Sequence, residues 1–156
     1  MIVNLQRKFK LDSKAFRAFI DEVLATVDEA SGGDVSVAFV SERRMRELNT
    51  IFRGKDGTTD VLSFPHEADE FEVQSTSFSS SDEGQRDESI TPNFLGDIVI
   101  SAEQAAKQAE ENDLSLELEI KQLILHGVLH LCGYDHEADD GEMNARELEL
   151  RDKLSI

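Results

Sequence analysis

The segment that carries His126, His130 and His136 constrains this chain most, because three of its four histidines lie within eleven positions. Apolar residues recur at helical spacing and predict a helix over 116–131. Since His126 and His130 are four positions apart, both imidazoles lie on one helix face and can reach one ion. Gly133 suits the left-handed turn that returns His136 as a third ligand. Three protein nitrogens leave a fourth position for water, which is typical of a catalytic zinc site.

The same spacing matches the metzincin protease pattern H-E-x-x-H-x-x-G-x-x-H, with one departure. Gly127 occupies the position of the glutamate base in those enzymes, so peptide hydrolysis by that route is disfavoured. Three structural or solvated histidines are the alternative interpretation, but the spacing favours a metal site. Zinc is the first metal to expect, although nickel or copper also accepts three imidazoles. Cys132 is a further candidate ligand, but it lies off the face of His126 and His130 and fits better as a small buried residue.

The length and composition indicate an ordinary globular protein. A chain of 156 residues is most simply a single domain, 1–156, and can bury a core. No stretch reaches the apolar length of a membrane span, and the first ten residues lack the apolar core of a signal peptide. A single cysteine excludes an internal disulfide and fits a reducing compartment. We therefore expect a cytoplasmic protein with no membrane partner.

The charge is unevenly distributed along the chain. The net charge of −17 argues against non-specific affinity for nucleic acid. Residues 1–55 nevertheless hold ten basic and eight acidic residues, whereas residues 56–156 hold six basic and 25 acidic ones. Several of the cations are close together, at Arg43, Arg44, Arg46, Arg53 and Lys55. A locally basic face is one interpretation, and a solvated helix surface is the other.

Strands and helices are expected in mixed order. Strands are predicted over 2–6, 35–40, 60–64 and 94–100, and helices after caps at Ser13, Ser41 and Ser101, over 116–131 and over 142–154. This order indicates a single α+β domain with a mixed sheet of about four strands. Residues 67–91 interrupt the pattern with serines and carboxylates, and they have too few apolar groups to offset the entropy of ordering. We interpret them as a mobile acidic insertion.

Several other residues are candidates for chemistry. Arg53 follows an apolar helix in a glycine-containing loop, and its guanidinium suits phosphate binding, although pairing with a nearby aspartate is the simpler interpretation from the loop alone. Asp97 interrupts the apolar run of a strand that we expect to be buried, and Asp135 lies beside His136. Each could accept a hydrogen bond from a metal-bound histidine or from loop amides, and Asp135 could also simply be exposed. The remaining candidates are Ser63 and Thr59, which lack a local histidine to activate them, and His66. His66 could lie near the metal or belong to the insertion, and we favour the insertion.

Three sequence blocks together resemble one known family. They are Leu48-Asn49 with Phe52-Arg53-Gly54-Lys55-Asp56 continuing through Thr59-Asp60-Val61-Leu62-Ser63-Phe64-Pro65, then Leu95-Gly96-Asp97-Ile98, then His126 to His136. In these blocks the chain is similar to the YbeY-type endoribonucleases of bacterial ribosomal RNA maturation. The resemblance implies a small mixed sheet covered by helices and a zincin-like site on the histidine helix and its following loop. It also implies a zinc ion on His126, His130 and His136, with Arg53 as the functional arginine.

The function implied by this resemblance is zinc-dependent cleavage of single-stranded RNA. Its implied substrate is the 3′ end of small-subunit (16S) rRNA, and its implied partners are the small ribosomal subunit and assembly factors. In this hypothesis the catalytic residues are Arg53, His126, His130 and His136. One alternative is a non-enzymatic ribosome assembly factor with a structural metal. The other is a metallopeptidase-like hydrolase that uses Asp135 or another carboxylate as its base.

Overall fold

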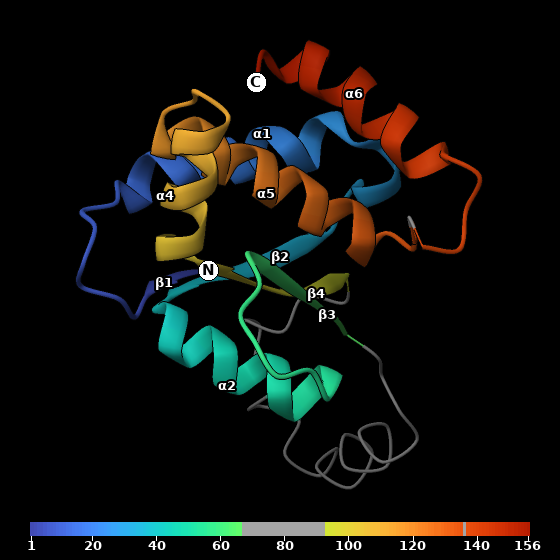
Figure 1. The fold of residues 1–156 in the computed structure, drawn as a ribbon. Helices are drawn as coiled ribbons and strands as arrows, with labels where there is room; N and C mark the ends of the chain where they lie inside the picture. Colours follow the sequence, from blue (N-terminus) through green and yellow to red (C-terminus); the bar gives the residue numbers. More distant parts are fainter. Residues whose placement is uncertain (67–92, 136) are drawn as a thin grey trace, which may run out of the picture.

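The computed structural model describes residues 1–66, 93–135 and 137–156. In chain order the elements are β1 (Ile2–Asn4), α1 (Ser13–Thr26), the 3₁₀ turn η1 (Asp28–Ala30), β2 (Asp34–Val40), α2 (Glu42–Arg53), β3 (Val61–Pro65), β4 (Phe94–Ser101), α4 (Ala102–Glu111), α5 (Leu116–Leu131) and α6 (Glu142–Leu154) (Figure 1). The predicted α+β class is confirmed. The acidic insertion predicted at 67–91 lies outside the described residues.

The four strands form one mixed sheet, as the sequence predicts. Their order is β1-β2-β4-β3, in which β1, β2 and β4 are parallel and β3 is antiparallel to β4. The register pairs Val61 with Ile100 and Phe64 with Asp97. Strand β3 therefore lies at an edge of the sheet and has β4 on one side.

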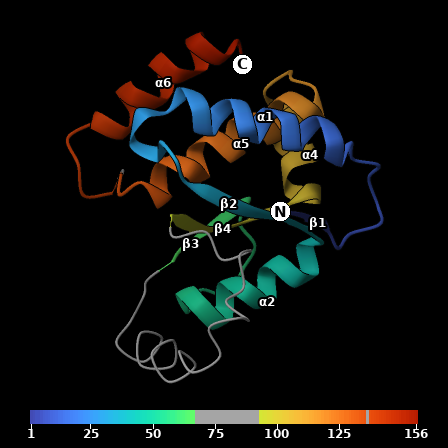
Figure 2. The ribbon, with the colours of Figure 1, turned by 180° about the vertical axis from the view of Figure 1, so that it is seen from behind.

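Helices cover both faces of the sheet. Helices α1, α5 and α6 lie over one face, whereas α2 lies over the other, as Figures 1 and 2 show from opposite sides. Because side chains alternate along a strand, β4 directs Ile98 and Ile100 toward α5 and Val99 toward α2. Strand β3 directs Leu62 and Phe64 toward α2 in the same way. Ser63, which lies between Leu62 and Phe64, therefore faces the side on which α5 lies.

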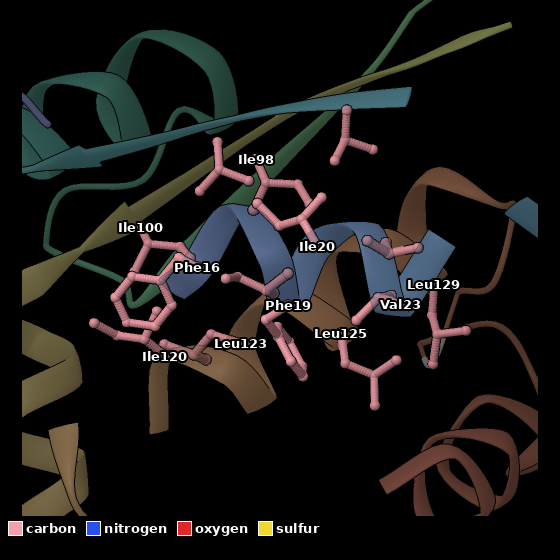
Figure 3. Close-up of a cluster of buried hydrophobic side chains, with 14 of the residues drawn as sticks. Phe16, Phe19, Ile20, Val23, Ile98, Ile100, Ile120, Leu123, Leu125 and Leu129 are labelled. Carbon is pink, nitrogen blue, oxygen red and sulfur yellow. The ribbon is translucent and has the colours of Figure 1, made fainter. Parts of the chain in front are cut away.

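The main core lies between α1, α5 and the sheet. Phe16, Ile20 and Val23 of α1 face apolar side chains of α5 across the cluster that Figure 3 shows. Complete burial of each such side chain contributes about 1.5–3 kcal/mol relative to exposure. A smaller cluster under α2 contains Met45 and Leu62. The histidine helix is thus fixed by its apolar face, which leaves its other face for chemistry.

Local capping explains most element boundaries. Ser41, Ser101 and Ser115 accept hydrogen bonds from the third helical residue of α2, α4 and α5, as expected of N-caps. Helix α1 differs from the prediction, because Asp12 rather than Ser13 accepts the capping bond, from the Ala15 N–H at 3.1 Å. Aspartate and serine cap equally well, so composition alone does not choose between adjacent residues. No helix in the described ranges is long and apolar enough to cross a membrane.

Candidate functional site

Helix α5 brings two of the predicted ligands together. Its buried residues include Ile124, Val128 and Leu129, which pack into the main core. His126 and His130 lie on the half-buried face, and their Nε2 atoms are 3.1 Å apart. The two rings meet edge to face with centroids 4.6 Å apart. Both Nε2 atoms are thus directed at the same small volume, as the four-residue spacing predicts.

The other ring nitrogen of each histidine has an acceptor beside it. Nδ1 of His126 lies 2.7 Å from Oε1 of Glu147, and Nδ1 of His130 lies 3.0 Å from the carbonyl oxygen of Tyr134. A carboxylate or carbonyl acceptor favours the tautomer that carries its proton on Nδ1, which leaves the Nε2 lone pair for an ion. These donors therefore fit a metal that accepts imidazole ligands. Within the described ranges no group of three potential ligands comes together, and the predicted third ligand, His136, lies outside them.

Glu147 is the site residue that the sequence interpretation missed. Only 8% of it is exposed, and its second oxygen accepts a hydrogen bond from Nη2 of Arg151 at 3.0 Å. Burial disfavours ionisation of Glu147, but the hydrogen bond with His126 and the charge of Arg151 together hold its pKa below the ordinary value. A signal was present, since Glu147 replaces an apolar residue in the buried stripe between Met143 and Leu150.

Of the two carboxylates that the sequence suggested as histidine partners, Asp135 lines the same cavity as the histidine pair and Asp97 does not. Asp97 was expected in a buried strand, but it is exposed. The reason is alternation along β4, which buries Ile98 and Ile100 under α5 and turns Asp97 to the opposite side. Asp135 is also exposed, and its side chain accepts a hydrogen bond from the Glu137 N–H at 3.0 Å within the turn.

The turn after α5 is held by a polar network. The hydroxyl of Tyr134 donates to Glu29 at 2.6 Å, and Arg146 donates to both oxygens of the same carboxylate at 2.8 and 3.1 Å. The hydrogen bond from Arg146 contributes most to lowering the pKa of Glu29 to about 2. Gly133 has the expected positive φ, 103°. This network fixes the backbone carbonyl that faces His130.

The environment of Cys132 does not favour a role in metal binding or catalysis. It is half-buried and packs against the main core, as the sequence interpretation expected. Burial raises the pKa of its thiol to about 11, and Glu29 acts in the same direction. Since the thiolate is the nucleophile and the metal ligand, this thiol stays inert near neutrality.

A cleft joins the histidine pair to Arg53. The cavity measures about 570 Å³, and it is lined by Arg53, Thr59, Asp60, Val61, Leu62, Ser63, Pro65, His126, His130, Gly133, Tyr134, Asp135 and Glu137. Helix α2 and the loop after it carry the arginine to the edge strand β3, and α5 lies over the same edge. His66 is not among the lining residues and instead packs edge-on against Phe94, with centroids 5.4 Å apart. The cleft therefore combines two imidazoles, a guanidinium and the hydroxyls of Thr59 and Ser63.

The position of the protease base is closed by packing. A Cβ added at Gly127 would come within 2.9–3.1 Å of three Ile98 side-chain atoms. Gly127 thus lets α5 approach β4 closely, and it faces the sheet rather than the cleft. A glutamate at this position would need space that Ile98 occupies.

These features define a class: an α+β protein with a histidine pair on a buried helix and an arginine across one cleft. The endoribonuclease YbeY family model matches residues 1–155. The chain therefore belongs to the endoribonuclease YbeY family, as its sequence blocks predict.

Individual relatives agree with this assignment. The chain is 43% identical over 124 residues to the endoribonuclease YbeY of Nautilia profundicola, which covers 79% of this chain and 73% of that protein. It is 35% identical over 156 residues to the endoribonuclease YbeY of Clostridioides difficile, at 97% and 93% coverage. The solution structure of TM1509 from Thermotoga maritima is also similar, with a TM-score of 0.58, 28% identity and coverage of 99% and 89%.

Proposed function

We propose that this protein is a zinc-dependent endoribonuclease that cleaves single-stranded RNA. The observation that carries the proposal is the cleft in which Arg53 faces the same cavity as His126 and His130. Cleavage of an RNA phosphodiester is accelerated by a cation that binds the anionic phosphate and by a group that activates the attacking oxygen. Relatives at 33–44% identity are named endoribonucleases, which supports the reaction class.

The roles of the residues follow from their chemistry. His126 and His130 would hold the metal through Nε2, and His136 is the proposed third ligand. When bound, the ion supplies Lewis acidity and lowers the pKa of water that it binds. Arg53 would bind the scissile phosphate and offset the charge that develops on its oxygens. Either water or the ribose 2′-hydroxyl can attack, and a 2′,3′-cyclic phosphate at the product end would identify the hydroxyl.

We further propose that the substrate is rRNA, at the 3′ end of the small-subunit species, and that the protein works in the cytoplasm with the small ribosomal subunit. A peptidase that uses a glutamate base in the metzincin position is disfavoured, because Gly127 stands there and packs against Ile98. A non-enzymatic assembly factor with a structural metal is the remaining alternative. It predicts subunit binding without RNA cleavage.

Substituting alanine for Arg53 is expected to slow cleavage about 10²–10³-fold, which is typical for loss of one group that stabilises transition-state charge. The measurement is single-turnover cleavage of a labelled single-stranded rRNA 3′ fragment by metal-loaded protein. Arg17→Ala is the matched control, since Arg17 is an exposed arginine on α1 and does not line the cleft. Equal rates for both variants would remove Arg53 from the mechanism. An inactive wild type that still binds the small subunit would favour the assembly factor.

Removing the carboxylate of Glu147 is expected to weaken zinc binding about 10–100-fold, the usual cost of losing an outer partner of a ligand histidine. Glu147→Gln should lose less than Glu147→Ala, because its amide oxygen can still accept from Nδ1 of His126. Competition with a chromogenic chelator measures the affinity without RNA. Glu149→Gln is the control on the same helix, since its side chain is 52% exposed and pairs with Arg146. Unchanged zinc affinity in Glu147→Ala would mean that this carboxylate does not support the ligand.

A further inference from the structure

An exposed aromatic side chain precedes the candidate phosphate-binding arginine. Phe52 lies in the last turn of α2 and is 62% exposed. Its ring contacts Phe64 of β3 edge to face, with centroids 5.0 Å apart and an interplanar angle of 67°. This contact orients the ring while most of it remains accessible. Exposure of a ring that is held in one orientation suits contact with a flat partner.

The phenylalanine pair lies next to the cleft but on the other side of the edge strand. Ser63 and Pro65 line the cleft, whereas Phe64 between them faces α2. Arg53 connects the two places, because it lines the cleft and directly follows Phe52. A chain that passes over the edge of β3 would therefore meet the guanidinium and the phenyl ring one after the other.

The charge around Phe52 selects the kind of partner. Residues 43–55 hold five cations and one carboxylate, in a protein whose net charge is −17. The carboxylate of Glu47 is paired with Arg44 at 2.9 Å. In the part of the chain that the structure describes, Arg46, Arg53 and Lys55 form no ion pair within 4 Å. A locally basic segment that carries an exposed aromatic ring is typical of proteins that bind single-stranded nucleic acid.

We propose that Phe52 is a stacking platform for a base of the single-stranded RNA whose phosphate Arg53 binds. This inference rests on the proposed function and adds a base-binding position outside the cleft. Stacking accepts any base, because each has a flat π face, so the contact contributes affinity and positioning rather than a sequence code. An apolar protein partner is the competing occupant, but the surrounding cations favour an anionic chain over an apolar surface.

The test measures binding of a short fluorescent single-stranded oligoribonucleotide by anisotropy, with no metal added so that cleavage does not interfere. Phe52→Ala is expected to weaken binding roughly 5- to 150-fold, the effect of losing one base–aromatic stack. Phe52→Trp should bind at least as well as the wild type. Ile51→Ala is the matched control, because Ile51 is 67% exposed on the same turn but cannot stack. A series of oligonucleotides, each lacking one base, locates the base that stacks. When that base is missing, Phe52→Ala and the wild type should bind with equal affinity.

The outcomes separate this inference from the proposed function. If the wild type binds and cleaves RNA and Phe52→Ala binds equally well, the stacking contact is absent and the nuclease assignment stands. If Ile51→Ala and Phe52→Ala weaken RNA binding equally, and abasic positions do not matter, the surface is a general apolar contact and stacking is overturned. If the wild type neither binds nor cleaves single-stranded RNA, both proposals fail. Circular dichroism spectra of all variants check that the helical content is unchanged.

Discussion

Substitution of His130 by alanine is expected to abolish both metal binding and RNA cleavage in a protein that remains folded. His130 contributes one of the two Nε2 atoms that lie 3.1 Å apart, so its loss removes a direct ligand. The loss should exceed the roughly 10–100-fold that removal of an outer partner costs. The ring is half-buried, and apolar neighbours on α5 such as Leu129 keep the helix in the core. Metal content by mass spectrometry and single-turnover cleavage measure the two effects.

His66→Ala is the control for this prediction. His66 is exposed, contacts Phe94 and does not line the cleft, so this variant should keep its metal and its activity. Retention of one metal ion per chain in His130→Ala would show that the ion is bound elsewhere. Loss of metal with full cleavage would show that the ion is not required for the reaction.

The sequence predicts the structural features that depend only on residues close together in the chain. Helix α5 begins and ends at the predicted residues, because Ser115 caps it and its apolar spacing continues to Leu131. The relative positions of His126 and His130 follow from that helix alone. The error at α1 is also local, since either Asp12 or Ser13 is a sound cap and only the observed bond distinguishes them.

Contacts between distant segments could not be obtained from such patterns. Glu147 meets His126 because α6 packs against α5, and no local rule specifies which residue of α6 faces the histidine. Asp97 was expected to be buried because a run of apolar residues suggests burial on both faces, whereas β4 alternates at that point and exposes Asp97. The approach of Arg53 to the histidines depends on the strand order, in which β3 crosses to the outer side of β4. The resemblance to a family supplied that connection where local patterns did not.

A methyl group added at Gly96 is expected to destabilise the protein by about 2–6 kcal/mol, a large part of the roughly 5–15 kcal/mol that stabilises a typical domain. Gly96 has φ 146°, which side-chain-bearing residues rarely adopt. An added Cβ would overlap the carbonyl oxygen of Phe64 and come within 2.8 Å of Leu131. Both neighbours are constrained, since Phe64 belongs to the edge strand and Leu131 ends the histidine helix.

Gly57→Ala separates the two causes of this loss. Gly57 has a similar φ of 139°, but nothing lies within 4 Å of an added Cβ there, so its substitution introduces backbone strain without overlap. Gly96→Ala should therefore lower the midpoint of urea unfolding clearly more than Gly57→Ala does. Because Gly96 lies where β3, β4 and the end of α5 meet, the remaining folded protein should also bind zinc more weakly. Equal midpoints for the two variants would show that the close contact with Phe64 and Leu131 can relax. Unchanged zinc affinity in Gly96→Ala would show that the geometry of the cleft does not depend on this contact.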